Sequence, residues 1–176
     1  QVSDSAALDT ELLLAYTLDI DRTWLNTWPN HQPVTEQIAT FEQLLLRRLN
    51  GEPTAFIIGT QGFWTLNLKV SPQTLIPRPE TELLVETALK IWKPANCRAL
   101  DLGTGSGAIA LALASERPGW QLTAVDSIDG AVQLAEINRQ NCQLDNVAIY
   151  QSDWFKQIPK TDGESKYHLI ISNPPY

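Results

Sequence analysis

The chain has 176 residues, of which 43% are hydrophobic and 19% are charged. It carries 13 basic and 20 acidic side chains, which leaves a formal net charge of −7. The apolar content excludes a disordered chain, and the length suits one domain or one domain with a small satellite. The acidic balance argues against a protein that holds nucleic acid mainly by neutralising phosphates, so we expect no direct nucleic-acid binding.

Three further features narrow the class of protein. No apolar run approaches the ~20 residues that a membrane-spanning helix needs, so we expect no membrane association. Cys97 and Cys142 are too few for a disulfide framework or a metal cluster, which favours a cytoplasmic protein without a metal site. The chain begins at Gln1 and stops at Tyr176 directly after an apolar run, so we expect it to be part of a longer protein.

The first third of the chain is predicted to be helical and acidic. Its first 60 residues hold eight acids and three bases, a net charge of −5. Ser5 or Asp4 can cap a first helix, and Thr35 is predicted to cap a second one. The apolar stripe of the second helix consists of Ile38, Phe41, Leu45 and Leu49. We therefore predict a small N-terminal helical domain over residues 1–53.

A change from helical to alternating periodicity marks the next segment. Apolar and polar residues alternate over 64–70, which is the pattern of a half-buried strand. With the short apolar run before it, this pattern predicts a β-hairpin linker over residues 54–73. A helix is predicted to begin at Pro79. Its buried face is predicted to consist of Leu83, Leu84, Thr87, Ala88 and Ile91.

The rest of the chain alternates between predicted strands and helices. Strands are predicted at 98–102, 121–126, 147–151 and 168–172, with helices at 107–116 and 130–142. Such βαβ units build a parallel sheet whose ligand sites lie at the carboxyl edge of the strands. The fold class is therefore α/β with a central, mostly parallel sheet.

The first motif with chemical significance is Asp101-Leu102-Gly103-Thr104-Gly105-Ser106-Gly107, between a predicted strand and a predicted helix. Glycines permit a sharp turn and a close approach of the backbone to a ligand, and the helix N-terminus offers unpaired N–H groups. Asp126 ends the next strand, where a carboxylate can accept both hydroxyl protons of a ribose. A plain βα turn and a dinucleotide site with the pattern G-x-G-x-x-G are the alternatives.

A second motif, Asp153-Trp154, follows the third predicted strand of the sheet. A carboxylate can accept a hydrogen bond from the amino group of adenine, and an indole can pack on the adenine face. With the glycine motif and Asp126, these side chains would complete a nucleoside pocket. The alternative is that Trp154 is simply one of six tryptophans in a core.

The third motif, Asn173-Pro174-Pro175-Tyr176, follows the last predicted strand. Two prolines remove two N–H donors, so carbonyl oxygens and the Asn173 side-chain oxygen remain as acceptors. Together with the Tyr176 ring, they form a site for a planar –NH2 group. A strand-to-loop turn without a ligand is the alternative.

In this order, the motifs resemble those of class I S-adenosylmethionine-dependent methyltransferases. The tetrapeptide 173–176 is similar to that of enzymes that methylate planar amino nitrogens, including adenine and glutamine-amide methyltransferases. Residues 74–82, together with Gly51-Glu52-Pro53 and the helical N-terminal region, closely resemble the HemK/PrmC family, the protein-(glutamine) methyltransferases of bacterial peptide chain release factors. His168 departs from the family, which commonly has an acidic residue there.

The resemblance implies a Rossmann-like methyltransferase domain over residues 74–176, truncated after its fourth strand, with S-adenosylmethionine as cofactor and S-adenosylhomocysteine as product. Contacts to the cofactor are implied for Asp101, Gly103, Thr104, Gly105, Ser106, Gly107, Asp126, Asp153, Trp154 and Asn173. Asn173, Pro174, Pro175 and Tyr176 would hold the glutamine of the Gly-Gly-Gln tripeptide of a release factor. Of these, Asn173, Pro174 and Tyr176 would be catalytic.

Two questions stay open at this point. Arg78 and Glu82 could order the hairpin over the methyl group, or they could only cap and salt-bridge the helix. The chain could also be an adenine-amino methyltransferase acting on DNA or RNA, or a non-catalytic nucleoside-binding module. A nucleic-acid enzyme should carry basic patches, whereas the only adjacent basic pair here is Arg47-Arg48.

Overall fold

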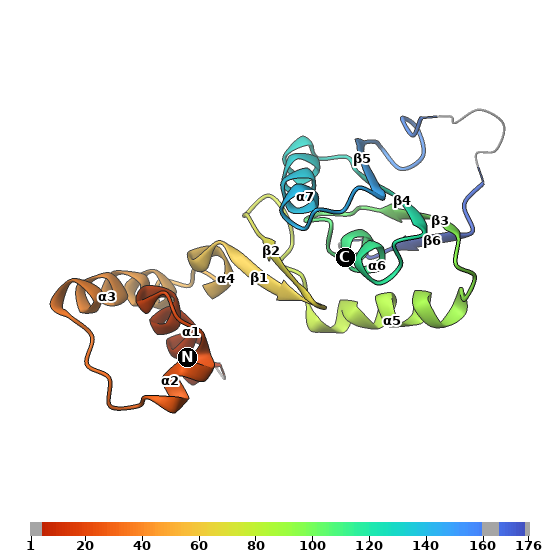
Figure 1. Cartoon of the computed structure of the whole chain (residues 1–176). Coiled ribbons are helices and arrows are strands. Elements are labelled where there is room, and N and C mark those ends of the chain that lie inside the picture. Colours follow the sequence, from red (N-terminus) through yellow and green to blue (C-terminus); the bar gives the residue numbers. More distant parts are fainter. Residues whose placement is uncertain (1–4, 160–165, 175–176) are drawn as a thin grey trace. The chain divides into compact units, whose positions relative to one another are not determined.

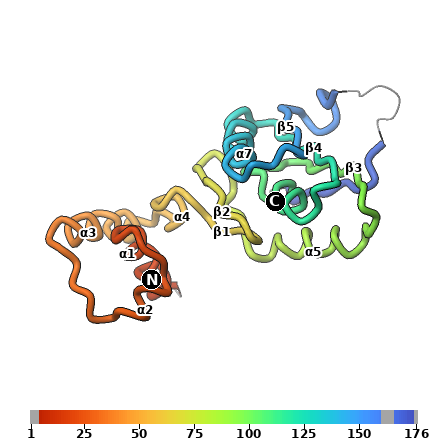
Figure 2. Tube along the Cα trace, in the orientation of Figure 1, coloured from red at the N-terminus to blue at the C-terminus, as the bar shows by residue number. Residues whose placement is uncertain are grey.

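A computed structural model describes residues 5–159 and 166–174. The chain divides into two compact units, Gln1–Gly59 and Thr60–Tyr176 (Figure 1). The trace in Figure 2 follows the helical first unit and the mixed second unit. No helix in these described ranges is both long enough and apolar enough to cross a bilayer.

The described part of the first unit is helical. It contains α1 (Ala6–Leu18), α2 (Arg22–Thr27), α3 (Thr35–Leu49) and α4 (Thr54–Ile58). Helices α1 and α3 confirm the two predicted ones, but the N-cap of α3 is Val34, so the predicted cap at Thr35 is wrong. Val34 instead donates its N–H to Oε1 of Gln37 at 3.0 Å.

Helix α4 replaces the first part of the predicted hairpin. Its apolar residues form a run too short for periodicity to separate strand from helix. Pro53 stands at its N-cap with φ −59°, and Gly59 ends it in the left-handed conformation with φ 84°. These two residues set the bounds of the helix, because proline is favourable before a first turn and glycine after a last one.

The carboxylate of Asp9 connects the helices of the first unit. Its Oδ1 accepts from the Thr54 hydroxyl at 2.9 Å, and its Oδ2 accepts from Nε of Arg48 at 3.0 Å. Burial alone would raise the pKa of Asp9, but the hydrogen bonds from Thr54, Arg48 and Ser5 outweigh it and hold the pKa below its ordinary value. One carboxylate thus joins α1 to both α3 and α4.

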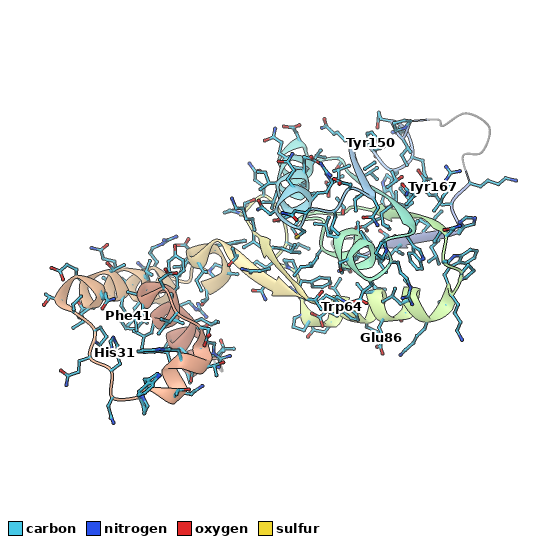
Figure 3. The ribbon with its side chains drawn as sticks, in the orientation of Figure 1. His31, Phe41, Trp64, Glu86, Tyr150 and Tyr167 are labelled. Carbon is cyan, nitrogen blue, oxygen red and sulfur yellow. The ribbon has the colours of Figure 1, made fainter. Side chains whose placement is uncertain are left out.

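The second unit begins with an antiparallel hairpin, β1 (Thr60–Phe63) and β2 (Leu66–Lys69). The predicted strand over 64–70 is wrong in its first two residues, because Trp64 lies in the turn with φ 56°. Trp64, which is labelled in Figure 3, is held there by two carboxylates. Its N–H donates to Glu82 and its indole Nε1–H donates to Glu116, each at 2.7 Å.

The segment after the hairpin forms the short helix η1 (Pro79–Thr81) and then α5 (Glu82–Ile91). The predicted buried face of α5 is wrong in part. Leu83 and Ile91 are 64% and 68% exposed, and Thr87 is exposed as well. The face that packs on the core consists of Leu84, Val85, Ala88 and Leu89. Both sets have helical spacing, so the pattern alone does not fix the rotation of the helix.

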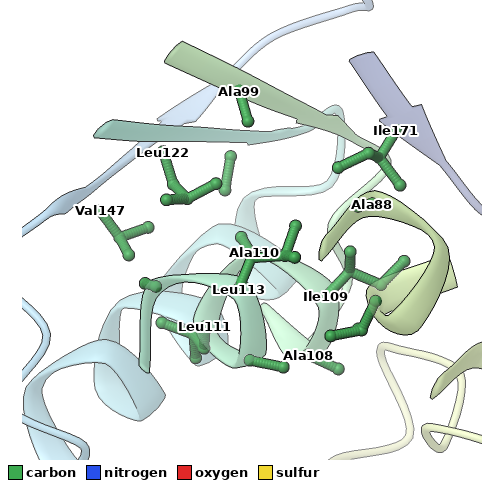
Figure 4. Close-up of a cluster of buried hydrophobic side chains, with 14 of the residues drawn as sticks. Ala88, Ala99, Ala108, Ile109, Ala110, Leu111, Leu113, Leu122, Val147 and Ile171 are labelled. Carbon is green, nitrogen blue, oxygen red and sulfur yellow. The ribbon is translucent and has the colours of Figure 1, made fainter. Parts of the chain in front are cut away.

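A parallel sheet in the order β5-β4-β3-β6 forms the centre of this unit and confirms the predicted α/β class. Its strands are β3 (Cys97–Leu102), β4 (Trp120–Asp126), β5 (Val147–Gln151) and β6 (Leu169–Ser172), and two more helices are α6 (Ala108–Glu116) and α7 (Asp129–Asn141). Side chains of Leu122, Val147 and Ile171 point from the sheet toward α6 (Figure 4). Helix α6 is buried from Ala108 to Ala114, so the core lies between it and the sheet.

His168 secures the start of β6. Its Nδ1 accepts the backbone N–H of Arg98 at 2.9 Å, and its own N–H donates to the Arg98 carbonyl at 2.8 Å. The ring stacks on Trp92 with 4.8 Å between centroids. An acidic side chain at this position could accept the same N–H, so the histidine can fill the role of an acid here.

Candidate functional site

The carboxyl ends of the parallel strands bring the predicted motifs to one edge of the sheet. The glycine loop, residues 103–107, joins the end of β3 to the start of α6. In the register of the sheet, Leu102 of β3 pairs with Ser172 of β6. Asn173 and the glycine loop therefore leave the sheet side by side, and Asp126 ends the strand on the other side of β3.

The glycine loop has a backbone conformation that residues with a side chain rarely adopt. Gly103 and Gly105 have φ values of 72° and 57°, in the left-handed region. The N–H groups of Gly103 and Thr104 both donate to the carbonyl of Val125 at 2.9 Å, which fastens the loop to β4. A side chain at Gly103 would meet nothing within 4 Å, so this part of the loop faces open space.

Gly107 has a different role from the other two glycines of the loop. A Cβ at this position would lie 3.0 Å from Leu111 Cδ1 and 3.3 Å from Ala135 Cβ. The absence of a side chain lets the loop pack tightly against α6 and α7.

Asp126 holds the loop from its other side. Its Oδ2 accepts the N–H of Gly105 at 2.9 Å, and its Oδ1 accepts the N–H of Ile128 at 3.0 Å. Each carboxylate oxygen has a second lone pair for a further donor. Asp126 is the residue that the sequence predicts to bind a ribose. The structure places its carboxylate in direct contact with the glycine loop.

Asp101 lies beneath the loop and is only 1% exposed. Its Oδ2 accepts from the Thr104 hydroxyl at 2.7 Å, whereas Oδ1 has no hydrogen-bond partner among the described residues. Burial raises the pKa of Asp101 to about 6 despite the Thr104 hydrogen bond, and the negative charge of Asp126 adds to the rise. Asp101 therefore does not line the surface of the site. It acts on the site indirectly, by supporting the glycine loop.

Asp153 and Trp154 form a turn just after β5. Trp154 has φ 54° and is 54% exposed, so it is not a core tryptophan. The Ser152 hydroxyl donates to its carbonyl at 2.7 Å. The Asp153 carboxylate is exposed and pairs with Lys156 on the same turn. An indole face and a carboxylate are thus both accessible here, and the roles toward adenine stay predictions.

Asn173 and Pro174 follow β6 and are exposed. The Asn173 side-chain Nδ2 donates to the Thr81 hydroxyl at 3.1 Å, which leaves its Oδ1 available as an acceptor. Pro175 and Tyr176 lie outside the described residues. Arg78 forms no ion pair within the described ranges, and Glu82 contacts the hairpin through Trp64.

Asn138 of α7 also belongs to this region, although no motif in the sequence points to it. Its side chain bonds the N–H and the carbonyl of Lys69 at 2.7 and 3.0 Å, and the carbonyl of Ser106 at 2.9 Å. No local signal predicts this contact, because its partners are main-chain atoms far away in the sequence.

The arrangement offers groups that a nucleoside ligand can use. The loop faces open space at Gly103, Asp126 has free lone pairs, and Trp154 offers an exposed ring. No cluster of three or more His, Cys, Asp or Glu side chains within residues 5–159 and 166–174 could hold a metal ion.

Two family models match the chain. Residues 1–59 match the PrmC N-terminal domain, and residues 79–176 match the methyltransferase small domain. Among curated proteins, the chain is similar to the release factor glutamine methyltransferases of three bacteria. The identity is 52% for Shewanella oneidensis, 54% for Pseudomonas aeruginosa and 47% for Escherichia coli K12, over 99%, 99% and 100% of this chain. The chain spans 59%, 62% and 62% of their lengths.

Two solved structures share the fold. One is a tRNA (uracil-54, C5)-methyltransferase of Pyrococcus abyssi in complex with S-adenosyl-L-homocysteine, with a TM-score of 0.51 and 17% identity over 66% of this chain and 28% of that one. The other is the N-terminal domain of human METTL16 in complex with SAH, with a TM-score of 0.51 and 20% identity over 64% and 48%. At these identities, the likeness concerns the fold alone.

Proposed function

The chain belongs to the methyltransferase small domain family, and on that premise we propose that it methylates the glutamine side chain in the Gly-Gly-Gln motif of bacterial peptide chain release factors. Release factor glutamine methyltransferases about half identical to the chain support this substrate. The observation that carries the proposal is the pairing of Leu102 with Ser172. Because of this pairing, the glycine loop and the Asn173 motif begin next to each other. Methyl transfer from a bound cofactor to a bound amide requires such closeness.

The cofactor in this proposal is S-adenosylmethionine, which leaves as S-adenosylhomocysteine. The glycine loop would hold its methionine part, with Asp101 and Thr104 supporting the loop from beneath. Asp126 would accept the ribose hydroxyls, and the turn at Asp153 and Trp154 would receive the adenine. When bound, the cofactor supplies an activated methyl group on a sulfonium.

The chain's own residues orient and activate the amide nitrogen of the glutamine, whose lone pair is delocalised into the amide carbonyl. Asn173 Oδ1 and the Pro174 carbonyl each accept one N–H of the glutamine amide, which aims the nitrogen and raises its electron density. Such positioning can supply up to roughly 7–11 kcal/mol of barrier reduction in ideal cases. The proton leaves the nitrogen for water after transfer.

Docking of a release factor is assigned to the first unit. A tripeptide alone offers little contact area, and the first 60 residues carry a net charge of −5. Such a surface suits a basic patch on the partner. The working compartment in this proposal is the cytoplasm, where release factors act.

One assay separates this function from its alternatives. The protein is incubated with methyl-labelled S-adenosylmethionine and either a release factor or an adenine-containing oligonucleotide. Label on the release factor supports the proposal. Label on the oligonucleotide alone would favour the adenine-amino methyltransferase, and label on neither would favour a binding module.

A further inference from the structure

We propose that Asn138 is a positioning residue that sets one wall of the cofactor pocket. The wall segment, residues 70–74, connects the hairpin to the rest of the second unit. In this proposal, Asn138 fixes the point at which the wall segment begins relative to the glycine loop, and so tunes affinity for the cofactor. The inference rests on the proposed function, because it assumes that S-adenosylmethionine binds at the loop.

The contacts of Asn138 join two segments of main chain. The residue is 1% exposed. Its Oδ1 accepts the N–H of Lys69, and its Nδ2 donates to the carbonyls of Lys69 and Ser106. Lys69 is the last residue of β2, and Ser106 lies inside the glycine loop. The amide is therefore a bridge between the end of the hairpin and the loop.

The chemistry of these partners makes the bridge specific for an amide. Backbone carbonyls only accept hydrogen bonds and a backbone N–H only donates, so the site needs two donors and one acceptor. Asparagine supplies all three from one short side chain. An aspartate would oppose two carbonyls with a negative charge, and an alanine would leave buried polar groups unpaired.

The wall segment then runs directly to the glycine loop. Thr74 Cβ lies 3.9 Å from the position that a Cβ on Gly105 would occupy. The side chain of Gln73 lies against Gly130 in the first turn of α7 and leaves no room for a side chain there. A turn that Thr74 closes by donating its N–H to Ser71 O at 3.1 Å keeps the segment compact. Thr74 is only five residues after Lys69. A displacement of the Lys69 backbone would therefore also displace Thr74 and the glycine loop that Thr74 adjoins.

Asn146 provides a matched control. Its Nδ2 lies 3.3, 3.3 and 3.1 Å from the carbonyls of Ala114, Arg117 and Trp120, so it is also an asparagine that ties main chain from several segments. Trp120 begins β4, which puts this amide at the amino end of the sheet, opposite to the glycine loop. Loss of either side-chain amide should destabilise the fold, but only loss of the Asn138 amide should weaken cofactor binding.

The test compares Asn138→Ala with Asn146→Ala. Affinity for S-adenosylhomocysteine is measured by calorimetry, and hydrogen exchange is followed over residues 69–74. We expect both variants to unfold at lower temperature. We expect roughly tenfold weaker binding for Asn138→Ala and less than about twofold for Asn146→Ala, where tenfold corresponds to about 1.4 kcal/mol. Exchange over 69–74 should accelerate only in Asn138→Ala.

Other outcomes would overturn the proposal. Equal weakening in both variants would show a general effect of stability, and unchanged binding by Asn138→Ala would remove the positioning role. If Asn138→Ala fails to fold, Asn138→Ser, which keeps a hydroxyl, is compared with Asn146→Ser by the same criteria. A wild-type protein that binds no S-adenosylhomocysteine would instead overturn the proposed function, and this inference with it.

Discussion

The carboxylate of Asp126 and the backbone N–H of Gly105 are joined by a hydrogen bond of 2.9 Å. This bond fastens the end of β4 to the middle of the glycine loop, and the same carboxylate also accepts the N–H of Ile128. A single side chain therefore shapes the loop and offers lone pairs to a ligand above it.

Replacing Asp126 with asparagine should weaken cofactor binding. One oxygen becomes an NH2 group, which must face either Gly105 or Ile128 donor to donor, and the acceptor for a ribose hydroxyl is lost. We expect roughly 10–100-fold weaker binding of S-adenosylhomocysteine, for a loss of about 1.4–2.7 kcal/mol. Calorimetry measures this change. Asp145→Asn, at an exposed position beyond α7, serves as the control and should bind like wild type.

Replacing Asp101 with asparagine should change how stability depends on pH. Burial raises the pKa of Asp101 from 3.8 to about 6, so the folded state binds a proton more tightly than the unfolded state in this interval. The contribution of Asp101 to the free energy of unfolding is therefore largest at low pH and is lost as pH rises through about 6. The loss amounts to roughly 3 kcal/mol.

The measurement is urea unfolding of wild type and Asp101→Asn from about pH 4 to about pH 7. We expect the stability of the variant relative to wild type to increase with pH over this range. A difference that stays constant with pH would contradict the raised pKa.

Replacing Asn173 with alanine should slow methyl transfer much more than it weakens cofactor binding. The variant loses the Oδ1 acceptor for the substrate amide and the hydrogen bond to Thr81. Loss of one orienting hydrogen bond is expected to cost roughly 10²–10³ in kcat. Single-turnover kinetics and calorimetry report the two steps separately. A variant with normal cofactor binding and the wild-type rate would refute the orienting role.

Replacing Asp9 with asparagine should destabilise the first unit by roughly 1–3 kcal/mol, because Arg48 then loses a charged partner. The wild-type contribution is full above the ordinary carboxyl pKa and is lost as pH falls through the lowered pKa of Asp9. Hydrogen exchange of α1 and α3 reports this local stability. Glu42→Gln on α3 should leave the exchange unchanged, and equal acceleration in both variants would contradict the role of Asp9.

The features that could be predicted from sequence are those with local signals. The glycine loop lies between a clear strand and a clear helix, so its position and its closeness to Asp126 follow from topology. The four strands of the described sheet could also be predicted, because each is a short apolar run between turn residues.

The features that could not be predicted depend on contacts between distant segments. Trp64 continues the alternation of a strand, but hydrogen bonds to the remote carboxylates of Glu82 and Glu116 hold it in a turn. Asn138 looks like any polar residue on a helix until its main-chain partners are known. The roles of Asp153 and Trp154 toward adenine stay predictions, as do those of Pro175 and Tyr176 toward glutamine.

The central claim is methylation of one glutamine in a release factor. The most direct measurement is label transfer from S-adenosylmethionine to a release factor with its Gly-Gly-Gln tripeptide intact, compared with the same factor carrying Gly-Gly-Ala. We predict label on the first factor, located by mass spectrometry at the tripeptide glutamine, and none on the second. Equal label on both factors, or no label on either, would contradict the claim.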